Sequence, residues 1–571
     1  MITELIQDFS GGINNSDAPN RIAPNQLAAA SNCWYDNNSI KARGAFTVGV
    51  AAADNTIAWG AKTYTVKMGH GARVFVLSST SYMFHMGRFT GIGLGPFYVQ
   101  NPDVQGSGWT SMTYGVGTVA TTNGSAVITG SGTSWTGSVR VGDAFTINIA
   151  GQTQVGEVLT VDTDTQLTMT ANWTTTNAAG TAYRISPTFD ASGVPSFEIV
   201  NNKVYMTTRT RMPAYWNATS IFNNTNSPIC AWYRLFKNYM FAANTSANPS
   251  RVSWSTIKDA ETWGASNFID VAPDDGEVIT GLFNNGHELI VLKRRSLYRL
   301  VGDVFDPSNP TYVLTKIYTP PECVFDSVNS WAIFNGVLTL YGGTGIYQYD
   351  GNAVSRLPVS DKLLGTLSGS SWVTASLINF EGWQTGQQAI TYNGKYWITS
   401  TQTGYGNILV LDGKNNWWQF TPPGANAASF DFFIMPGNGT TTYNSLWTIN
   451  RNSSTDLCGT YLLDQAFSNE AIAASFTTRV YEYQKKQRFG KAWLHFKRAT
   501  TGSIAFGYKV DEGTTVNATV DMRTGAGTRA KSVPIMIGRV GQSVQFVIAH
   551  SASSEDFEVY AIEFERQDLR L

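Results

Sequence analysis

Short runs of alternating apolar and polar residues make up most of the chain. They end at Asn-Gly, Asp-Gly and Gly-Gly pairs, which supply the positive φ angles that tight hairpin turns need. The stretch from Ser330 to Gly351 is representative, because it alternates strand-like segments with an Asn-Gly turn, a Gly-rich turn and an Asp-Gly turn. Helical spacing is nearly absent, and the one short helix that the pattern favours covers residues 24–33, where a proline precedes an alanine run. The pattern predicts an all-β protein.

Units of this kind recur along the chain. Their first turns fall at Gly286, Gly336 and Gly394, so successive units begin 50 and 58 residues apart. Weaker copies surround His70-Gly71, Asn201-Asn202, Lys237-Asn238 and residues 443–449. Aromatic β-meanders with a period of roughly 40–50 residues are typical of propeller blades, which bury their two apolar faces only between neighbouring blades. We therefore expect an interrupted β-propeller of about seven units, with six to eight as the range.

Two stretches interrupt the repeat. Residues 105–187 contain short strands and turns rich in Gly, Thr and Asn, which indicates a small β-barrel inserted into a blade connection. From residue 471 the strands lengthen, and each alternates as in a two-layer β-sandwich. The predicted organisation is an N-terminal arm at 1–55, a first propeller unit at 56–104, the inserted small β-barrel at 105–187, the remaining propeller units at 188–470 and a C-terminal β-sandwich at 471–571.

Composition narrows the functional classes. Charged residues form 14 % of the 571 residues, against roughly 25 % in ordinary soluble domains. Lys and Arg (40) nearly balance Asp and Glu (41), which argues against a dedicated nucleic-acid-binding protein with a basic face. No apolar run approaches the ~18 residues of a transmembrane helix, and the N-terminus lacks the features of a signal peptide. We expect no membrane-spanning segment and synthesis in a cytoplasm.

Candidate chemistry is sparse. The four cysteines and five histidines are scattered without metal-ligand spacing, and neither a nucleophile elbow nor a phosphate loop occurs. Asp274, Asp275 and Glu277 lie together beside Gly276, a pattern that favours a solvated turn over the paired carboxylates of a glycosidase. The sequence therefore predicts no catalytic, cofactor-binding or metal-binding residues, no cofactor and no enzymatic activity.

Basic charge concentrates between residues 479 and 498, where seven Lys and Arg residues stand against the single acid Glu482. Three interpretations remain open: docking to an acidic partner, contact with DNA phosphates, and a solvated strand edge on which lysines prevent sheet-to-sheet pairing. The candidate partner-docking residues are Arg479, Lys485, Lys486, Arg488 and Lys491.

The first 50 residues lack the repeat but carry apolar side chains that can anchor them. Phe9, Ile13 and Trp34 are the candidate arm anchors. They could attach the arm to its own propeller or to a neighbouring subunit.

Several motifs occur in a characteristic order. They are Asp8-Phe-Ser-Gly-Gly-Ile-Asn14 near the start, stretches between Pro249 and Leu300 in the middle, and residues 545–551 and 557–563 near the end. In this order they resemble the tail nozzle proteins of short-tailed bacteriophages, a family that includes tail tubular protein B and the packaged-DNA stabilisation hub proteins. The Gly- and Thr-rich insert is similar to small β-domains found in phage tail components.

The resemblance implies a structural virion protein of the phage tail, assembled in the host cytoplasm. It would form a homo-oligomeric ring of six copies at the head–tail connection, contact the tail adaptor and portal proteins, and dock tail fibres or spikes. Double-stranded DNA would pass through its lumen without sequence-specific binding, and the ring would retain the packaged genome until ejection. The alternative is a carbohydrate-binding or glycan-cleaving β-propeller of a fibre or hydrolase. A stopper or hub of a long-tailed phage would share the same propeller.

Overall fold

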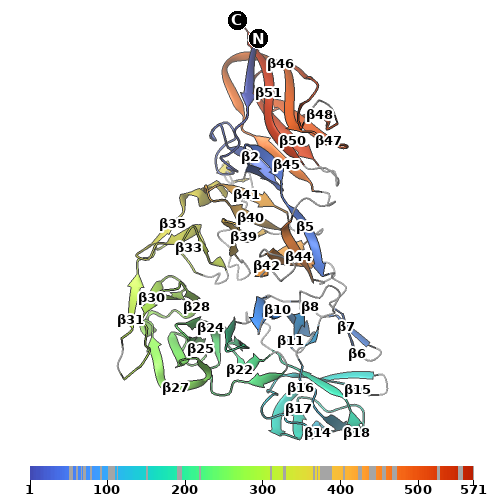
Figure 1. Ribbon diagram of the computed structural model, residues 1–571, viewed down its shortest axis with the longest axis vertical. Coiled ribbons are helices and arrows are strands. Elements are labelled where there is room, and N and C mark those ends of the chain that lie inside the picture. The colour runs from blue at the N-terminus through green and yellow to red at the C-terminus, as the bar shows by residue number, and fades with distance from the viewer. Residues whose placement is uncertain are drawn as a thin grey trace.

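The computed structural model is built almost entirely of antiparallel β-sheets (Figure 1). It describes residues 1–50, 113–149, 152–188, 196–217, 220–308, 311–325, 330–363, 389–402, 405–421, 427–435, 445–452, 458–465, 472–523, 528–550 and 557–569, together with the isolated strand segments 56–59, 62–65, 67–68, 73–77, 80–89, 93–100, 110–111, 367–368 and 371–372.

One five-stranded and six four-stranded sheets of the described chain form the units of a propeller-like body, numbered here as blades 1 to 7. Blade 1 contains β8 (Lys67–Met68), β9 (Arg73–Leu77), β10 (Thr80–Phe89), β11 (Gly93–Gln100) and β12 (Thr110–Ser111). Blade 2 contains β20 (Ser196–Val200), β21 (Lys203–Thr208), β22 (Arg211–Trp216) and β23 (Ile221–Asn223). Blade 3 contains β24 (Cys230–Phe236), β25 (Tyr239–Thr245), β26 (Arg251–Thr256) and β27 (Asp259–Asp270).

The remaining blades follow the same plan. Blade 4 contains β28 (Ile279–Asn284), β29 (Leu289–Lys293), β30 (Leu297–Val301) and β31 (Val313–Ile317). Blade 5 contains β32 (Ala332–Phe334), β33 (Val337–Tyr341), β34 (Ile346–Tyr349) and β35 (Val354–Arg356). Blade 6 contains β38 (Ala389–Tyr392), β39 (Lys395–Gln402), β40 (Tyr405–Leu411) and β41 (Trp417–Phe420), and blade 7 contains β42 (Ala427–Met435), β43 (Ser445–Asn452), β44 (Cys458–Gln465) and β5 (Ala45–Val50). Outside the blades lie the hairpins β6 (Thr56–Trp59)–β7 (Lys62–Thr65) and β36 (Leu367–Ser368)–β37 (Ser371–Trp372), and the short 3₁₀ helices η2 (Pro273–Asp275) and η4 (Pro358–Leu363).

The hairpin turns have the backbone that their residues predict. Both central residues have positive φ in the turns Asn335-Gly336 (50° and 77°) and Asn393-Gly394 (47° and 66°). The weaker copies Asn201-Asn202 and Lys237-Asn238 share this conformation. Such turns match the twist of the strands that they join. The antiparallel sheets that they connect confirm the all-β prediction. The predicted turn at His70-Gly71 lies outside the described residues.

Side chains of one strand alternate between two cores. On β29, Leu289 and Val291 pack into the core shared with blade 3, while Ile290 and Leu292 pack into the core shared with blade 5. Polar bonds also cross between blades, since Tyr396 donates a hydrogen bond to the carbonyl of Ser330 at 2.6 Å. Blade 4 thus has two buried faces, and the predicted propeller arrangement of seven units is confirmed.

Blade 7 is completed from the other end of the chain. Its fourth strand is β5, which pairs antiparallel with β44. In addition, β42 of blade 7 contacts β9 of blade 1, so the last blade lies beside the first. The two ends of the propeller sequence are therefore joined through one shared sheet.

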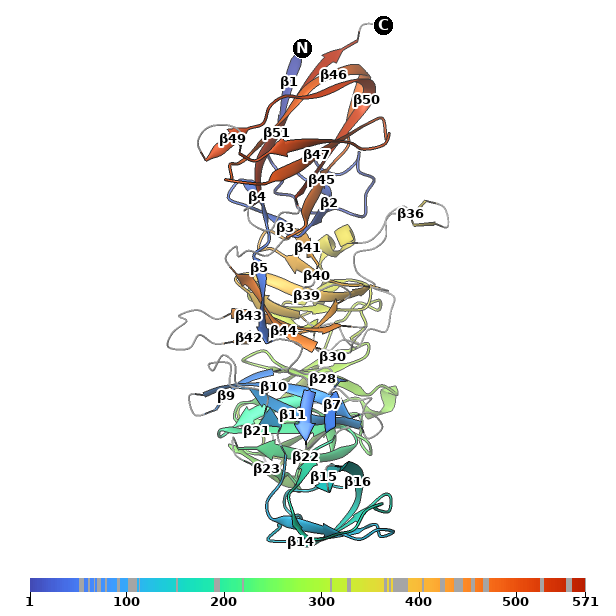
Figure 2. The same cartoon turned by 90° about the vertical axis from the view of Figure 1, so that its right-hand side faces the viewer.

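The inserted barrel-like sheet follows the order β18-β13-β14-β17-β16-β15-β19. Its strands are β13 (Thr118–Thr121), β14 (Val127–Ser131), β15 (Ala144–Ile149), β16 (Gln152–Thr163), β17 (Gln166–Met169), β18 (Asn177–Thr181) and β19 (Tyr183–Ser186). It encloses a core in which Trp135, Phe145 and Tyr183 pack together. Figure 2 places this sheet at one end of the long axis and the C-terminal strands at the other.

The C-terminal sheet has 11 strands, with the main path β2-β45-β50-β46-β51-β4-β3. Its members are β1 (Ile2–Ile6), β2 (Leu27–Ser31), β3 (Cys33–Asp36), β4 (Ser39–Ala42), β45 (Ala474–Thr478), β46 (Tyr481–Lys497), β47 (Ser503–Val510), β48 (Val516–Asp521), β49 (Arg529–Lys531), β50 (Ile535–His550) and β51 (Glu558–Asp568). The long strands β46 and β50 each pair with several neighbours, so the sheet bends around one aromatic core that contains Phe546 and Phe564. The predicted sandwich is thus a single continuous sheet.

The prediction of a helix at residues 24–33 is wrong. Residues Leu27–Ser31 form β2, which pairs with β45 of the C-terminal sheet. The hydrogen bonds and burial offered by that sheet outweigh the helix preference of three alanines. The segment predicted as a separate arm is divided between two sheets, because β1 to β4 belong to the C-terminal sheet and β5 to blade 7.

Among the helices of the described residues, none combines the length and apolar character required to cross a bilayer.

Candidate functional site

The candidate arm anchors lie at the junction between the C-terminal sheet and blade 6. Phe9 and Ile13 are almost fully buried in a core that also contains Trp418. The Phe9 ring lies 5.5 Å from the ring of Phe476, and the amide of Ile13 donates to the carbonyl of Trp417 at 3.0 Å. The anchors therefore contact elements of their own chain.

Trp34 contributes to the same junction but is only partly buried. Its ring meets the ring of Phe420 edge-on, with 5.6 Å between centroids. The ammonium group of Lys395 lies 3.7 Å from the Trp34 ring centroid, a distance suited to a cation–π contact. Blade 6 thus holds the N-terminal strands through edge-on aromatic and cation–π contacts as well as hydrogen bonds.

The basic segment does not act as one unit. The Arg479 guanidinium donates to the carbonyl of Asn20 at 2.7 Å and to that of Val480 at 3.2 Å. It also lies 5.7 Å from the Tyr481 ring. Arg479 therefore fixes the N-terminal segment against the C-terminal sheet.

The other four candidate docking residues, Lys485, Lys486, Arg488 and Lys491, are exposed on β46. Across the ladder, Arg488 faces Val540 and Lys491 faces Met536, and these two apolar side chains are 51 % and 63 % exposed. Among the described residues, no carboxylate forms an ion pair with these four cations. These cationic and apolar side chains thus lie on paired segments of β46 and β50, and β46 runs close to both chain termini (Figure 1).

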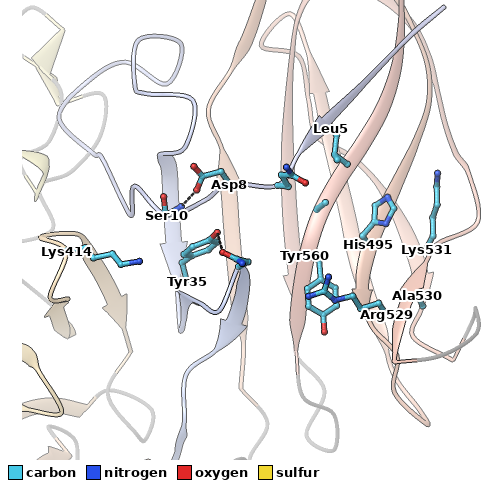
Figure 3. Close-up of a pocket in the computed structure, with 13 residues that line it drawn as sticks. Leu5, Asp8, Ser10, Tyr35, Lys414, His495, Arg529, Ala530, Lys531 and Tyr560 are labelled. Carbon is cyan, nitrogen blue, oxygen red and sulfur yellow. Dashed lines mark hydrogen bonds between the residues drawn. The ribbon is translucent and has the colours of Figure 1, made fainter.

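A pocket of about 810 Å³ lies where the N-terminal strands, blade 6 and the C-terminal sheet meet (Figure 3). This volume falls within the range of ~300–1,000 Å³ that is typical of small-molecule sites. We call it the junction pocket. It is lined by Leu5, Gln7, Asp8, Ser10, Tyr35, Asn38, Lys414, His495, Arg529, Ala530, Lys531, Tyr560 and Ala561.

A lysine and a histidine of the pocket share one carboxylate. Glu563 accepts a hydrogen bond from Lys531 at 2.7 Å and contacts His495 Nε2 at 2.8 Å. Burial disfavours the charged carboxylate, but the hydrogen bonds from Lys531 and His495 outweigh it and lower the pKa of Glu563. Glu563 therefore remains ionised and holds both side chains in place.

The other two cations are held differently. The Arg529 guanidinium lies 4.2 Å from the centroid of the Tyr560 ring, as a cation–π pair. Lys414 belongs to the turn between β40 and β41, where its backbone amide donates to Asp412 Oδ1 at 2.9 Å. Neither charged group forms an ion pair with a carboxylate in the described part of the chain.

One carboxylate also lines the pocket. Asp8 lies on the N-terminal segment, and its Oδ1 accepts the backbone amide of Ser10 at 2.9 Å (Figure 3). The neighbouring Tyr35 hydroxyl lies 3.5 Å from Asn38 Oδ1. The junction pocket therefore combines cations, one acid, two phenol rings and neutral hydrogen-bonding groups.

Sequence reasoning missed this pocket. Its residues come from positions 5–38, 414 and 495–561, and no motif joins them. Tyr35 of β3 and Lys414 line the same pocket only because β3 contacts β41 of blade 6 in the folded chain. The sequence offers no local signal for such a site, because pairing between distant strands creates it.

The acidic turn is structural. Asp275 Oδ1 accepts the Lys293 ammonium group at 2.6 Å, and Lys293 is fully buried. Glu277 Oε2 accepts the backbone amide of Arg295 at 3.1 Å. These bonds connect the segment before β28 to the turn between β29 and β30. Asp275 and Glu277 therefore stabilise a turn, as the sequence indicated.

Metal and thiol chemistry find little support in the described ranges. Those ranges contain no group of three or more His, Cys, Asp or Glu residues positioned to hold a metal ion. Cys33, Cys230 and Cys323 are free thiols, and burial raises their pKa values.

Comparison with known proteins finds only distant structural similarity. No family model and no curated protein matches the sequence. Among solved structures, an exo-β-1,3-galactanase from Phanerochaete chrysosporium with galactose is similar at 12 % identity and a TM-score of 0.23, over 58 % of this chain and 95 % of that chain. A catalytically inactive virginiamycin B lyase from Staphylococcus aureus has 10 % identity and a TM-score of 0.29, over 50 % of this chain and 92 % of that chain. A glycoside hydrolase has 10 % identity and a TM-score of 0.22, over 86 % of this chain and 96 % of that chain.

These findings correct one expectation. The sequence motifs predict no enzymatic activity, whereas the similar solved structures include a galactanase and a glycoside hydrolase. The exclusion rested on the absence of sequence motifs, but active sites on a β-propeller are assembled from loops of several blades and need no local motif. That exclusion is therefore withdrawn. At these identities and TM-scores the similarity concerns the fold and assigns no activity to this chain.

Proposed function

We propose that the chain is a structural subunit of a short phage tail, of the nozzle or hub type. The observation that carries this proposal is the meeting of the N-terminal and C-terminal motifs in one module. Phe9 and Ile13, from the first motif, share a core with Phe546 and Phe557, from the last. The middle motif falls in blades 3 and 4. The first and last motifs of the nozzle-like series therefore share one core, and the middle motif lies in the propeller.

The proposed role is mechanical. Six copies would close into a ring through heterologous interfaces, each burying more than roughly 1,000 Å². The ring would surround double-stranded DNA without reading its sequence, retain the packaged genome, and contact the tail adaptor and portal on one side and fibres or spikes on the other. Assembly would take place in the host cytoplasm and the mature location would be the virion tail.

The exposed part of the basic segment supports one of these contacts. Lys485, Lys486, Arg488 and Lys491 project from β46 beside exposed Val540 and Met536. A partner with carboxylates around an apolar centre would complement this surface, because charge selects the partner and buried apolar area supplies affinity. We assign this surface to a tail partner rather than to DNA, since it combines charge with apolar side chains.

Ring formation is the direct test. We expect native mass spectrometry and negative-stain images of the purified full chain to show closed rings, either alone or after the adaptor protein of the same virion is added. A mass-spectrometry inventory of purified virions should also contain the chain. A strict monomer under both conditions, together with its absence from virions, would refute the tail assignment.

Carbohydrate binding or cleavage is the second candidate function. The junction pocket favours it, because Tyr35 and Tyr560 line a cavity together with the polar groups of Gln7, Ser10 and Asn38. Aromatic faces with nearby amides and hydroxyls are suited to sugar rings, which have apolar faces and polar edges.

Cleavage has its own assay. If the chain is a hydrolase, incubation with host cell-surface polysaccharide will release reducing ends in proportion to protein concentration. If the pocket only binds, no reducing ends will appear while the polysaccharide is still retained on immobilised protein. Neither reducing ends nor retention would eliminate this second candidate.

A further inference from the structure

We infer that the junction pocket binds a carboxylated oligosaccharide, such as a chain of uronic acid residues. This inference rests on the second candidate function and names its ligand class. It is independent of ring formation, because every residue involved belongs to one copy of the chain.

The charged groups of the pocket favour an anionic ligand. Among the described residues that line the pocket, Lys414, His495, Arg529 and Lys531 can be cationic, and Asp8 is the acid. Glu563 engages both His495 and Lys531. Lys414 and Arg529 form no ion pair with a described carboxylate. Two cations that are free to bind favour an anionic ligand, and an Arg guanidinium can hold a carboxylate with two parallel hydrogen bonds.

Two of the cationic side chains are held in place by neighbouring residues. Tyr560 holds the Arg529 guanidinium through its ring, and Glu563 holds Lys531, whose ammonium group also lies 4.4 Å from the Trp493 ring. Side chains fixed in this way lose less conformational freedom when a ligand binds. The cationic wall of the pocket is therefore built before any ligand arrives.

The two cations without an ion pair lie on opposite sides of the pocket. Figure 3 shows Lys414 on one side and Arg529 on the other, with Tyr35 between them. A ligand that reaches both cations must be extended and must pass the Tyr35 ring. An oligosaccharide with a carboxylate on successive residues meets these requirements, since its rings can stack on the phenol while its charges reach both sides.

The remaining groups distinguish a sugar from other anions. The Asp8 carboxylate would repel the phosphates of DNA or the side chains of an acidic peptide, but it can accept a hydrogen bond from a sugar hydroxyl. Gln7, Ser10 and Asn38 provide neutral donors and acceptors along the same wall. A ligand with one carboxylate and several hydroxyls per residue fits this mixture better than a uniform polyanion.

The test uses isothermal titration calorimetry on the full chain. A galacturonate oligomer should bind, and a neutral galactose oligomer of equal length should bind at least about tenfold more weakly, because it lacks the charge-assisted hydrogen bonds. Arg529→Gln and Lys414→Gln should each weaken galacturonate binding about tenfold or more. Lys485→Gln removes the same charge from β46 outside the pocket and should change the affinity less than about twofold.

Several results would overturn the inference. They are no binding of galacturonate by the unchanged protein, equal affinity for the neutral oligomer, or the same loss in Lys485→Gln as in Arg529→Gln. Tighter binding of a polyglutamate peptide would show that the pocket takes an acidic protein segment, and tighter binding of inorganic phosphate would indicate a phosphate site. Circular dichroism and thermal unfolding of each variant exclude misfolding. Ring images of the same samples separate failure of this inference from failure of the tail assignment.

Discussion

Phe9→Ala is expected to reduce the stability of the junction between the C-terminal sheet and blade 6 by about 3–5 kcal/mol. Phe9 is 2 % exposed and packs against Phe476 in the core that joins the N-terminal strands to the C-terminal sheet. Removing the ring leaves a cavity that the bent sheet cannot close, because its strands are held by hydrogen bonds on both sides. Hydrogen exchange measured by mass spectrometry should show faster exchange in β2 and β45.

Leu5→Ala is the matched control. Leu5 lies four residues earlier on the same segment but is 53 % exposed, so its loss should change stability within about 0.5 kcal/mol. If both variants exchange at the same rate as the unchanged protein, Phe9 is not an anchor and the N-terminal strands are held by hydrogen bonds alone.

Arg140→Met is expected to destabilise the inserted sheet by about 3–5 kcal/mol, the usual effect of breaking a buried ion pair by removing one partner. Both side chains of the pair are almost fully buried, and Arg140 Nη2 lies 3.2 Å from Asp143 Oδ1. Arg140 Nη1 also donates to the carbonyl of Met212 on β22 at 2.6 Å, which connects the insert to blade 2. Hydrogen exchange measured by mass spectrometry should therefore show faster amide exchange of the variant in β15 and in β22.

The pH dependence of this variant has a definite sign. Burial raises the pKa of Asp143, and Arg140 opposes that rise. Without Arg140 the folded-state pKa rises further above the unfolded value. The folded state then binds the proton more tightly, so the variant regains stability on acidification and loses it as pH rises toward the folded-state pKa. The difference in stability from the unchanged protein should shrink in acid.

A surface pair provides the comparison. Arg523 and Asp521 form an ion pair at 2.7 Å on the exposed turn after β48. Solvent screens such pairs, so Arg523→Met should leave the unfolding transition unchanged within error. An equal effect of the Arg140 and Arg523 substitutions, or a pH-independent Arg140 effect, would contradict the role given to the buried pair.

The candidate functional residues illustrate the limits of local reasoning. The basic segment was visible as a run of charges, yet the structure separates Arg479, which holds the N-terminal segment, from the exposed cations of β46. Charge density alone does not reveal which side chains have partners, because those partners come from distant strands. For the same reason no motif marks the residues of the junction pocket.

The all-β class, the hairpin turns and the number of repeating units could be predicted from the amino-acid sequence alone. These follow from strand alternation and from the positive φ that Asn-Gly pairs adopt at low cost, and both are local properties of the chain. Tertiary structure decided where the N-terminal segment lies, why Leu27–Ser31 is a strand, and which charges meet at the junction pocket. Those outcomes depend on pairing between residues more than 400 positions apart, such as Ala30 with Phe476. The free energy of this strand pairing exceeds the local secondary-structure preference of the paired residues, and no local sequence motif indicates it.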